Sequence, residues 1–211
     1  MPINNSRENI LSKIKQALVN PVPVPFAGGN TNDDVFLPSS QDIEIEFAEN
    51  FTKLLGKFSF CADMTELVTN ITILLDSRSW KNIYCRDNEL KQKLSSNGFS
   101  DFNYPSLATC DASITTCESL IARTGSIVLS SAEQSGRTVS VYAPVHICIA
   151  YTSQLVYDIK DGLQLLKAKY GTNLPSLITF ATGPSRTADI EKTLVVGVHG
   201  PKEVFCFLVD G

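Results

Sequence analysis

The residue types best suited to bind an anion gather near the C-terminus, in the stretch TGPSRTADIEKTLVVGVHGP at residues 182–201. The apolar segment before it predicts a strand. Gly183 then permits a turn, and Ser185 or Thr187 can cap a short helix. The N–H groups at the start of a helix bind anions, and Arg186 would add a positive charge. The stretch therefore predicts a strand–turn–helix that binds an anion.

Two carboxylates and a histidine follow in the same stretch. Asp189 and Glu191 can act in a site, or can simply stabilise a helix start, where negative charge is favourable. His199 lies between two glycines at a strand end, where the backbone around Gly200 can approach a ligand closely. The stretch matches neither common phosphate-binding pattern, because no GK[ST] follows it and it lacks GxGxxG.

A second group of candidates lies in the segment LIARTGSIVLSSAEQSGR. Thr124 and Gly125 precede a predicted strand, and Gly125 permits a turn with positive φ or a close backbone approach. Arg137 lies in a turn between two predicted strands. It can hold a carboxylate or phosphate through two hydrogen bonds, although a solvated turn arginine has the same pattern. Glu133 in that turn can be a nucleophile, a base or a surface carboxylate.

The chain has two histidines, His146 and His199. His146 begins the predicted strand VHICIAY, where it can be a general base, a hydrogen-bond partner for a substrate or a half-buried structural histidine. A metal site would have to combine the histidines with Asp189 and Glu191 over long range, because no HxxxH or HExxH occurs. We therefore expect no metal in this chain. The GxSxG turn of many Ser-His-Asp hydrolases is absent as well.

The first half of the chain alternates helices and strands. Periodic apolar residues predict helices over residues 6–19, 42–55, 64–75 and 88–96, with strands in KFSFCA and NIYCRD. Such alternation is typical of a largely parallel sheet with helices on its faces. The alternating prolines of NPVPVPF predict an extended connector. We therefore expect an N-terminal helix and proline-rich arm over residues 1–40 and a single domain over residues 41–211.

The second half is rich in strands. Six segments are predicted as strands: GSIVLSS, TVSVYAP, VHICIAY, SLITFAT, LVVGVHG and EVFCFLVDG. The turn SAEQSGR favours a hairpin between the first two, and residues 154–170 are predicted as a long helix. The chain is therefore assigned to the α/β class, with a mixed sheet, flanking helices and a strand-rich second half.

The composition limits the kinds of partner. The 211 residues are 43% hydrophobic and 19% charged, which is ordinary for a soluble globular protein. The net charge of −4 offers no basic surface for nucleic acid or an anionic membrane. No apolar run approaches the ~20 residues of a membrane-spanning helix, and the first residues lack a secretory pattern. We expect a cytoplasmic protein.

Six cysteines are spread along the chain, and four of them lie in apolar or strand-rich contexts. Such contexts favour buried free thiols. Cys110 and Cys117 are seven residues apart and no CxxC occurs, whereas iron–sulfur and structural zinc sites usually show tighter pairs. We therefore expect no cofactor on this chain.

Several of these segments together resemble the LutC/YkgG family, the lactate-utilisation (LUD) domain proteins. The resemblance covers roughly residues 40–211 and rests on TCDASITTCESLIARTGSIVL, SGR, PVHI, GPSRTADIE and LVVGVHGP. It implies a fold like that of the NagB/RpiA/CoA-transferase group, a twisted α/β sheet with a strand-rich second layer. It also implies a role in oxidising L-lactate to pyruvate beside iron–sulfur partner proteins, which would carry the clusters.

The first functional hypothesis is a subunit of this lactate-oxidising system. It would bind a small carboxylate through Arg137, Arg186 and the histidines, or would organise the iron–sulfur partners. Lactate needs an arginine for its carboxylate and a base near its hydroxyl, and His146 or His199 can be that base. We expect the quoted segments to line one cleft together with Arg137 and His146.

Two other hypotheses stay open. An independent transferase or isomerase would act on an acyl-CoA or a phosphosugar, with Glu133 or Glu191 as nucleophile or base. A regulatory or scaffold module would use the same residues structurally, for example in a pair between Arg186 and Asp189. A homo-oligomer is compatible with each hypothesis, since the N-terminal helix can pack on another subunit.

Overall fold

The computed structural model describes residues 4–19, 39, 41–102, 104–190 and 193–211 of the chain. The chain divides into two compact units, residues 1–38 and 39–211. In the first unit the described part is helix α1 (Asn4–Leu18) with the residue that follows it, which confirms the predicted N-terminal helix. The expected proline-rich arm lies, apart from Ser39, outside the described residues.

Within the described residues of the second unit, five parallel strands form the central sheet, in the spatial order β1–β11–β6–β3–β2. Their bounds are Lys57–Cys61 (β1), Ile83–Cys85 (β2), Ala112–Thr115 (β3), Val145–Tyr151 (β6) and Glu203–Val209 (β11). Strands β6 and β11 are nearly continuous runs of buried residues. Such runs are typical of parallel strands that other layers cover on both faces.

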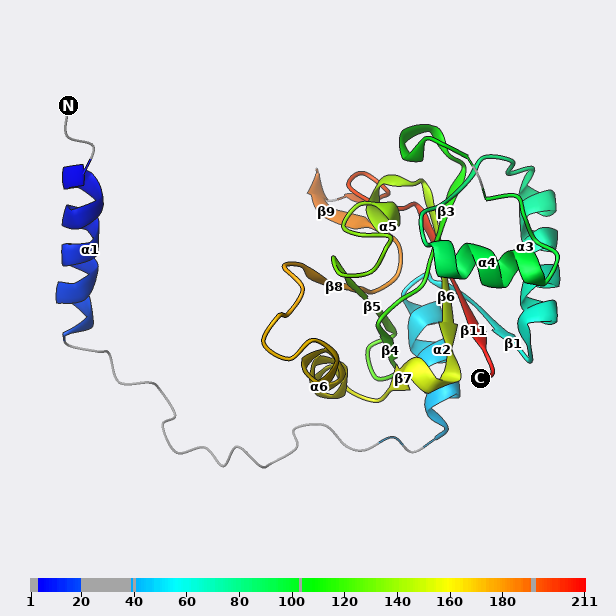
Figure 1. Cartoon of the computed structure of the whole chain (residues 1–211), viewed down its shortest axis with the longest axis horizontal. Coiled ribbons are helices and arrows are strands. Elements are labelled where there is room, and N and C mark those ends of the chain that lie inside the picture. The colour runs from blue at the N-terminus through cyan, green and yellow to red at the C-terminus, as the bar shows by residue number, and fades with distance from the viewer. Residues whose placement is uncertain (1–3, 20–38, 40, 103, 191–192) are drawn as a thin grey trace. The chain divides into compact units, whose positions relative to one another are not determined.

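Helices α3 (Met64–Arg78) and α4 (Asn88–Ser96) cover one face of this sheet (Figure 1). The carboxylates of Asp63 and Asp87 cap the two helices by accepting hydrogen bonds from their first N–H groups. Apolar side chains of both helices are buried against Ile147 and Ile149 of β6. The predicted helix over residues 88–96 is confirmed at both ends.

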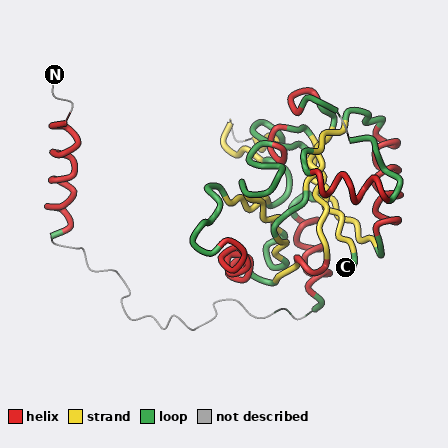
Figure 2. Tube along the Cα trace, viewed as in Figure 1, coloured by secondary structure: helices red, strands yellow, loops and turns green. Residues whose placement is uncertain are grey.

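A second, smaller sheet packs on the opposite face, with the strand order β7–β4–β5–β8. Its strands are Ser119–Ile121 (β4), Ser126–Ser130 (β5), Leu155–Val156 (β7) and Ile178–Ala181 (β8). Helix α2 (Ile43–Lys53) contributes Phe47 and Phe51 to the apolar layer between the sheets. Helix α6 (Ile159–Tyr170) packs on the far side of the smaller sheet. The predicted mixed α/β fold with a strand-rich second half is therefore confirmed (Figure 2).

Short elements complete the described chain. They are the 3₁₀ turns η1 (Leu107–Thr109) and η2 (Thr152–Gln154), helix α5 (Val139–Tyr142), and strands β9 (Arg186–Ile190) and β10 (Thr193–Val196). Strands β9 and β10 pair antiparallel with each other. Among the described residues, no helix is both long and apolar enough to cross a bilayer.

Three local predictions were wrong. The segment TVSVYAP contains α5 and not a strand, so SAEQSGR closes no hairpin; β5 pairs instead with the distant strand β8. Residues 186–190 form a strand and not a helix, because the chain returns at once to pair Val196 with Arg186. The helix expected from residue 154 begins only at Ile159, since Leu155 pairs with β4.

Two glycines allow the smaller sheet to approach helix α2 closely. Gly125 has a φ of +60°, and a Cβ placed on it would lie 2.5 Å from the backbone nitrogen of Phe51. Gly183 has a φ of +77°, and its Cβ would lie 2.3 Å from the carbonyl oxygen of Leu54. The positive φ and the close approach predicted for Gly125 are both present, and its neighbour is α2.

The close packing of Gly125 predicts a large cost for Gly125→Ala. Alanine would meet both an unfavourable φ and the backbone of α2, so we expect a loss of at least about 3 kcal/mol in the free energy of unfolding. Gly98 is the matched control, because its φ is +91° and nothing lies within 4 Å of its Cβ position. Gly98→Ala should cost about 1 kcal/mol. Equal losses in urea unfolding would contradict this account.

Candidate functional site

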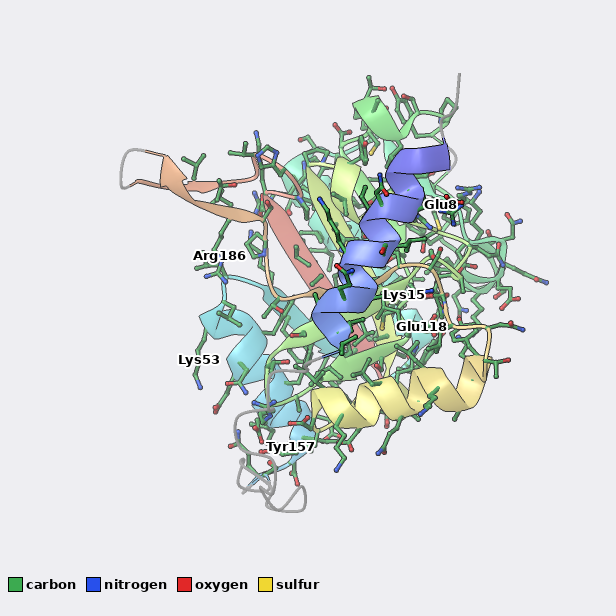
Figure 3. The ribbon with its side chains drawn as sticks, turned by 90° about the vertical axis from the view of Figure 1, so that its left-hand side faces the viewer. Glu8, Lys15, Lys53, Glu118, Tyr157 and Arg186 are labelled. Atoms are coloured by element: carbon green, nitrogen blue, oxygen red, sulfur yellow. The ribbon has the colours of Figure 1, made fainter. Side chains whose placement is uncertain are left out.

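A cavity of about 340 Å³ opens at the amino ends of β6 and β11. We call it the inner cavity. It collects six residues predicted from the sequence, from three separate segments: His146, Gly183, Ser185, Arg186, His199 and Gly200. Figure 3 labels Arg186 at the start of β9. The expectation that these segments meet at one place is therefore met for the C-terminal stretch and for His146.

Backbone hydrogen bonds hold the two halves of the C-terminal stretch together. The N–H of Ser185 donates to the carbonyl of Pro201 at 2.9 Å, and the N–H of Gly197 donates to the carbonyl of Ser185 at 2.8 Å. A Cβ on Gly200 would lie 2.9 Å from the Cβ of Ser185, so the glycine allows the two segments to touch. Arg186 and His199, thirteen positions apart, consequently face the same cavity.

His146 forms part of the buried wall of the inner cavity. It lies on β6 two residues before Cys148, on the face that packs toward the smaller sheet, and only 1% of its surface is exposed. Its Nε2 lies 2.8 Å from the hydroxyl of Thr115. Burial lowers the pKa of His146 to about 4, so the imidazole is neutral at pH 7. It is more deeply buried than the half-buried structural histidine considered for it, and its contact with Thr115 is internal to the fold.

The basic side chains at the opening of the inner cavity are exposed. Arg186 and His199 both reach solvent. No carboxylate lines this cavity among the side chains that the structure describes. Glu191 lies outside the described residues; Asp189 has its backbone in β9, but its side chain is not described. The described lining favours an anion.

Thr124 and Gly125 lie behind the cavity and do not line it. The hydroxyl of Thr124 lies 2.8 Å from that of Ser126, which lies 2.8 Å from that of Thr182 in the cavity wall. A row of hydroxyl groups thus connects the Thr124 turn to the wall. Thr187, the other predicted cap, lies within β9 and pairs with Val195.

Arg137 does not line the inner cavity. It is exposed, and its guanidinium donates a hydrogen bond to the hydroxyl of Ser176, on the loop before β8. Arg137 was expected in a turn between two strands, but α5 follows it instead of a strand. The part of the prediction that put Arg137 in one cleft with His146 is not met.

Glu133 lies at a different cavity of about 270 Å³, which we call the Glu133 cavity. This cavity adjoins the carboxyl ends of β2, β3 and β6, where open α/β sheets commonly bind ligands. Lys169 donates hydrogen bonds to Glu118 at 2.8 Å and to Glu133 at 3.2 Å. The hydroxyl of Thr116 lies 3.3 Å from Glu133. Figure 3 shows Glu118 well apart from Arg186.

The two glutamates near Lys169 differ in their pKa. Burial raises the pKa of Glu133, and the neighbouring charge of Glu118 raises it further. Burial alone would also raise the pKa of Glu118, but hydrogen bonds from Lys169, Ser130 and Tyr170 bring it below its usual value. Neighbouring carboxylates with opposite shifts suit an acid and a base. Sequence reasoning identified Glu133 but missed Glu118 and Lys169, which no motif marks.

The six cysteines are buried, and none forms a disulfide. The thiols of Cys117, Cys148 and Cys206 interact in a row between the sheets, and the pKa values of Cys117 and Cys148 are raised well above the usual value. Thiols of this kind are poor nucleophiles. Among the described residues, no group of three or more histidine, cysteine or acidic side chains is placed to hold a metal ion.

Comparison with known proteins gives a consistent family. The LUD domain model matches residues 45–209. Lactate utilization protein C of Bacillus licheniformis is 36% identical over 112 residues, which are 52% of this chain and 47% of that protein. The protein of the same name from Halalkalibacterium halodurans is 43% identical over 101 residues, 47% of this chain and 44% of the relative. These matches span about half the length of the curated relatives.

A solved structure shares the fold. It is the crystal structure of a DUF162 family protein from Deinococcus radiodurans, which superposes with a TM-score of 0.60 and 20% sequence identity. The superposition covers 82% of this chain and 99% of that one. At this level of identity the similarity establishes the fold alone.

The buried His146 predicts a loss of stability in mild acid. The unfolded chain binds a proton below the usual imidazole pKa of 6.5, whereas the folded chain does so only below about 4. Stability should therefore fall by roughly 3 kcal/mol as the pH drops through this window. His146→Gln can keep the hydrogen bond to Thr115 and should lack that part of the loss. Parallel stability curves for both proteins, from urea unfolding between pH 7.5 and 4, would refute the prediction.

Proposed function

The chain belongs to the LUD domain family, and we propose that it is a subunit of an L-lactate utilisation system whose inner cavity binds a small carboxylate such as lactate or pyruvate. The names of the relatives support the role in lactate utilisation. The observation that carries the ligand proposal is the gathering of Arg186, Ser185 and His199 around one cavity without a described carboxylate.

The lining suits each part of such a ligand. A carboxylate can accept two parallel hydrogen bonds from the guanidinium of Arg186. The hydroxyl of Ser185 and the imidazole of His199 can hydrogen-bond the hydroxyl or keto oxygen beside it. His146 in the buried wall is neutral at pH 7, so the positive charge of the cavity is that of Arg186 at its exposed end.

Oxidation of lactate to pyruvate removes two electrons. We assign the acceptance of these electrons to iron–sulfur partner proteins of the same system. The work of this chain is then to bind and orient the carboxylate, or to organise those partners. This division follows from the resemblance to the LutC/YkgG family, and each part of it can be tested.

Binding of the carboxylate predicts stabilisation of the folded protein. Pyruvate at a hundred times its dissociation constant should add roughly 2.7 kcal/mol to the free energy of unfolding. Arg186→Ala should abolish this thermal shift. Arg137→Ala is the matched control, since Arg137 is an exposed arginine outside the cavity, and it should keep the shift. Failure of both L-lactate and pyruvate to shift the wild-type protein would count against a small-carboxylate site.

The role in the cell predicts a growth defect. Deletion of the gene, in a strain without a paralogue, should abolish growth on L-lactate while leaving growth on pyruvate. The wild-type gene and the Arg137→Ala gene should restore growth, whereas the Arg186→Ala gene should not. Normal growth of the deletion strain on L-lactate would refute the role.

A second candidate function is an acid–base enzyme acting on a sugar phosphate or an acyl-CoA. One observation favours it: Glu133 and Lys169 border a cavity at the carboxyl ends of parallel strands. In that case a sugar phosphate or acyl-CoA, and not pyruvate, should give the thermal shift. Glu133→Gln should remove its turnover, and Arg186→Ala should leave it unchanged. No shift with any of these compounds would favour a scaffold role.

A further inference from the structure

A third cavity, of about 430 Å³, adjoins the inner cavity, and we call it the outer cavity. The two share three lining residues, Val141, His199 and Gly200. They therefore form one continuous cleft. Its inner part is lined by the start of β9, and its outer part lies between α5 and the segment that follows β10.

The outer cavity differs from the inner one in chemistry. Its lining includes Tyr142, Val198 and Pro144, and the first two are 69% and 45% exposed. Single exposed apolar residues are ordinary, but several around one hollow mark a binding surface. The lining also contains Lys202. The aliphatic part of its side chain packs closely against Gly197, where an added Cβ would lie 2.2 Å from its Cγ. No carboxylate belongs to its lining among the described side chains.

The groups are ordered along the cleft. Arg186 and Ser185 line the inner cavity alone, His199 lines both, and Tyr142 with Val198 lines the outer cavity alone. A 2-oxo or 2-hydroxy acid has the same order of parts: a carboxylate, an adjacent oxygen and then the side chain. Cavities of 300–1,000 Å³ usually take ligands of drug-like size, and lactate has only a methyl group as its apolar part.

We propose that the cleft takes 2-oxo or 2-hydroxy acids whose apolar or aromatic side chain extends into the outer cavity, with pyruvate and lactate as the smallest members of the class. This inference rests on the proposed function, because it uses Arg186 as the carboxylate-binding group. It adds a specificity surface, formed by Tyr142 and Val198, that recognises the part of the ligand away from the carboxylate.

Affinity for a series of 2-oxo acids tests the proposal. Calorimetry would compare pyruvate, 4-methyl-2-oxopentanoate and phenylpyruvate on the full chain. Each methylene that becomes fully buried should tighten binding about fourfold, so the two larger acids should bind at least about tenfold more tightly than pyruvate. Tyr142→Ala should weaken phenylpyruvate about tenfold and leave pyruvate within about twofold. Val198→Ala should act in the same direction.

The control is Ile73→Ala, because Ile73 is 61% exposed on α3 and lines neither cavity; all affinities should stay unchanged. Pyruvate binding that depends on Arg186, without any gain for the larger acids, would overturn this inference and leave the proposed function standing. The same holds if Tyr142→Ala weakens pyruvate and phenylpyruvate equally. Binding of none of the acids would overturn both.

Discussion

The packing of helix α2 against the smaller sheet is the constraint on which the rest of the second unit depends. Phe47 and Phe51 stack with their ring centroids 5.4 Å apart and fill the layer between the two sheets. The side chain of Asn50 donates to the carbonyls of Ala122 and Arg123, which fixes the turn before β5. Gly183 touches the end of the same helix. The turn that carries Ser185 and Arg186 is therefore positioned by a helix far away in the sequence.

This arrangement separates two kinds of chemistry to opposite edges of the central sheet. At the amino edge, Arg186 and His199 face a cavity without a described carboxylate. At the carboxyl edge, Lys169 forms ion pairs with Glu118 and Glu133, whose side chains are largely buried. The first edge offers basic groups that can hold an anion, whereas the second offers carboxylates and a lysine that suit proton transfer. The separation of charge therefore distinguishes the two candidate sites more sharply than their sizes do.

The sequence allowed the long helices and the buried strands to be predicted, because their apolar periodicity is a local property. Strands such as β4 and β7 were missed because they are short and are stabilised by partners distant in the chain. Strand β9 was mistaken for a helix for a related reason: pairing between Arg186 and Val196 overrides the local signal. Part of the site was predicted because glycine and histidine are residue types with special conformational and chemical properties, which drew attention to Gly183, His146 and His199. Lys169 carries no such mark, and its role depends on the tertiary position of α6.

The exposure of Arg186 has a consequence for how the cleft can bind. Its guanidinium stays in contact with water and offers the same two hydrogen bonds to the carboxylate of every 2-oxo acid, so this contact is needed for binding but does not distinguish one acid from another. The neutral His146 and the hydroxyl of Thr182 line the wall without adding charge. Apolar contact is then the remaining source of affinity, and along this cleft it is available beside Tyr142 and Val198. An acid with a methyl side chain would bind weakly and exchange rapidly, whereas an acid that reaches the outer cavity would be retained.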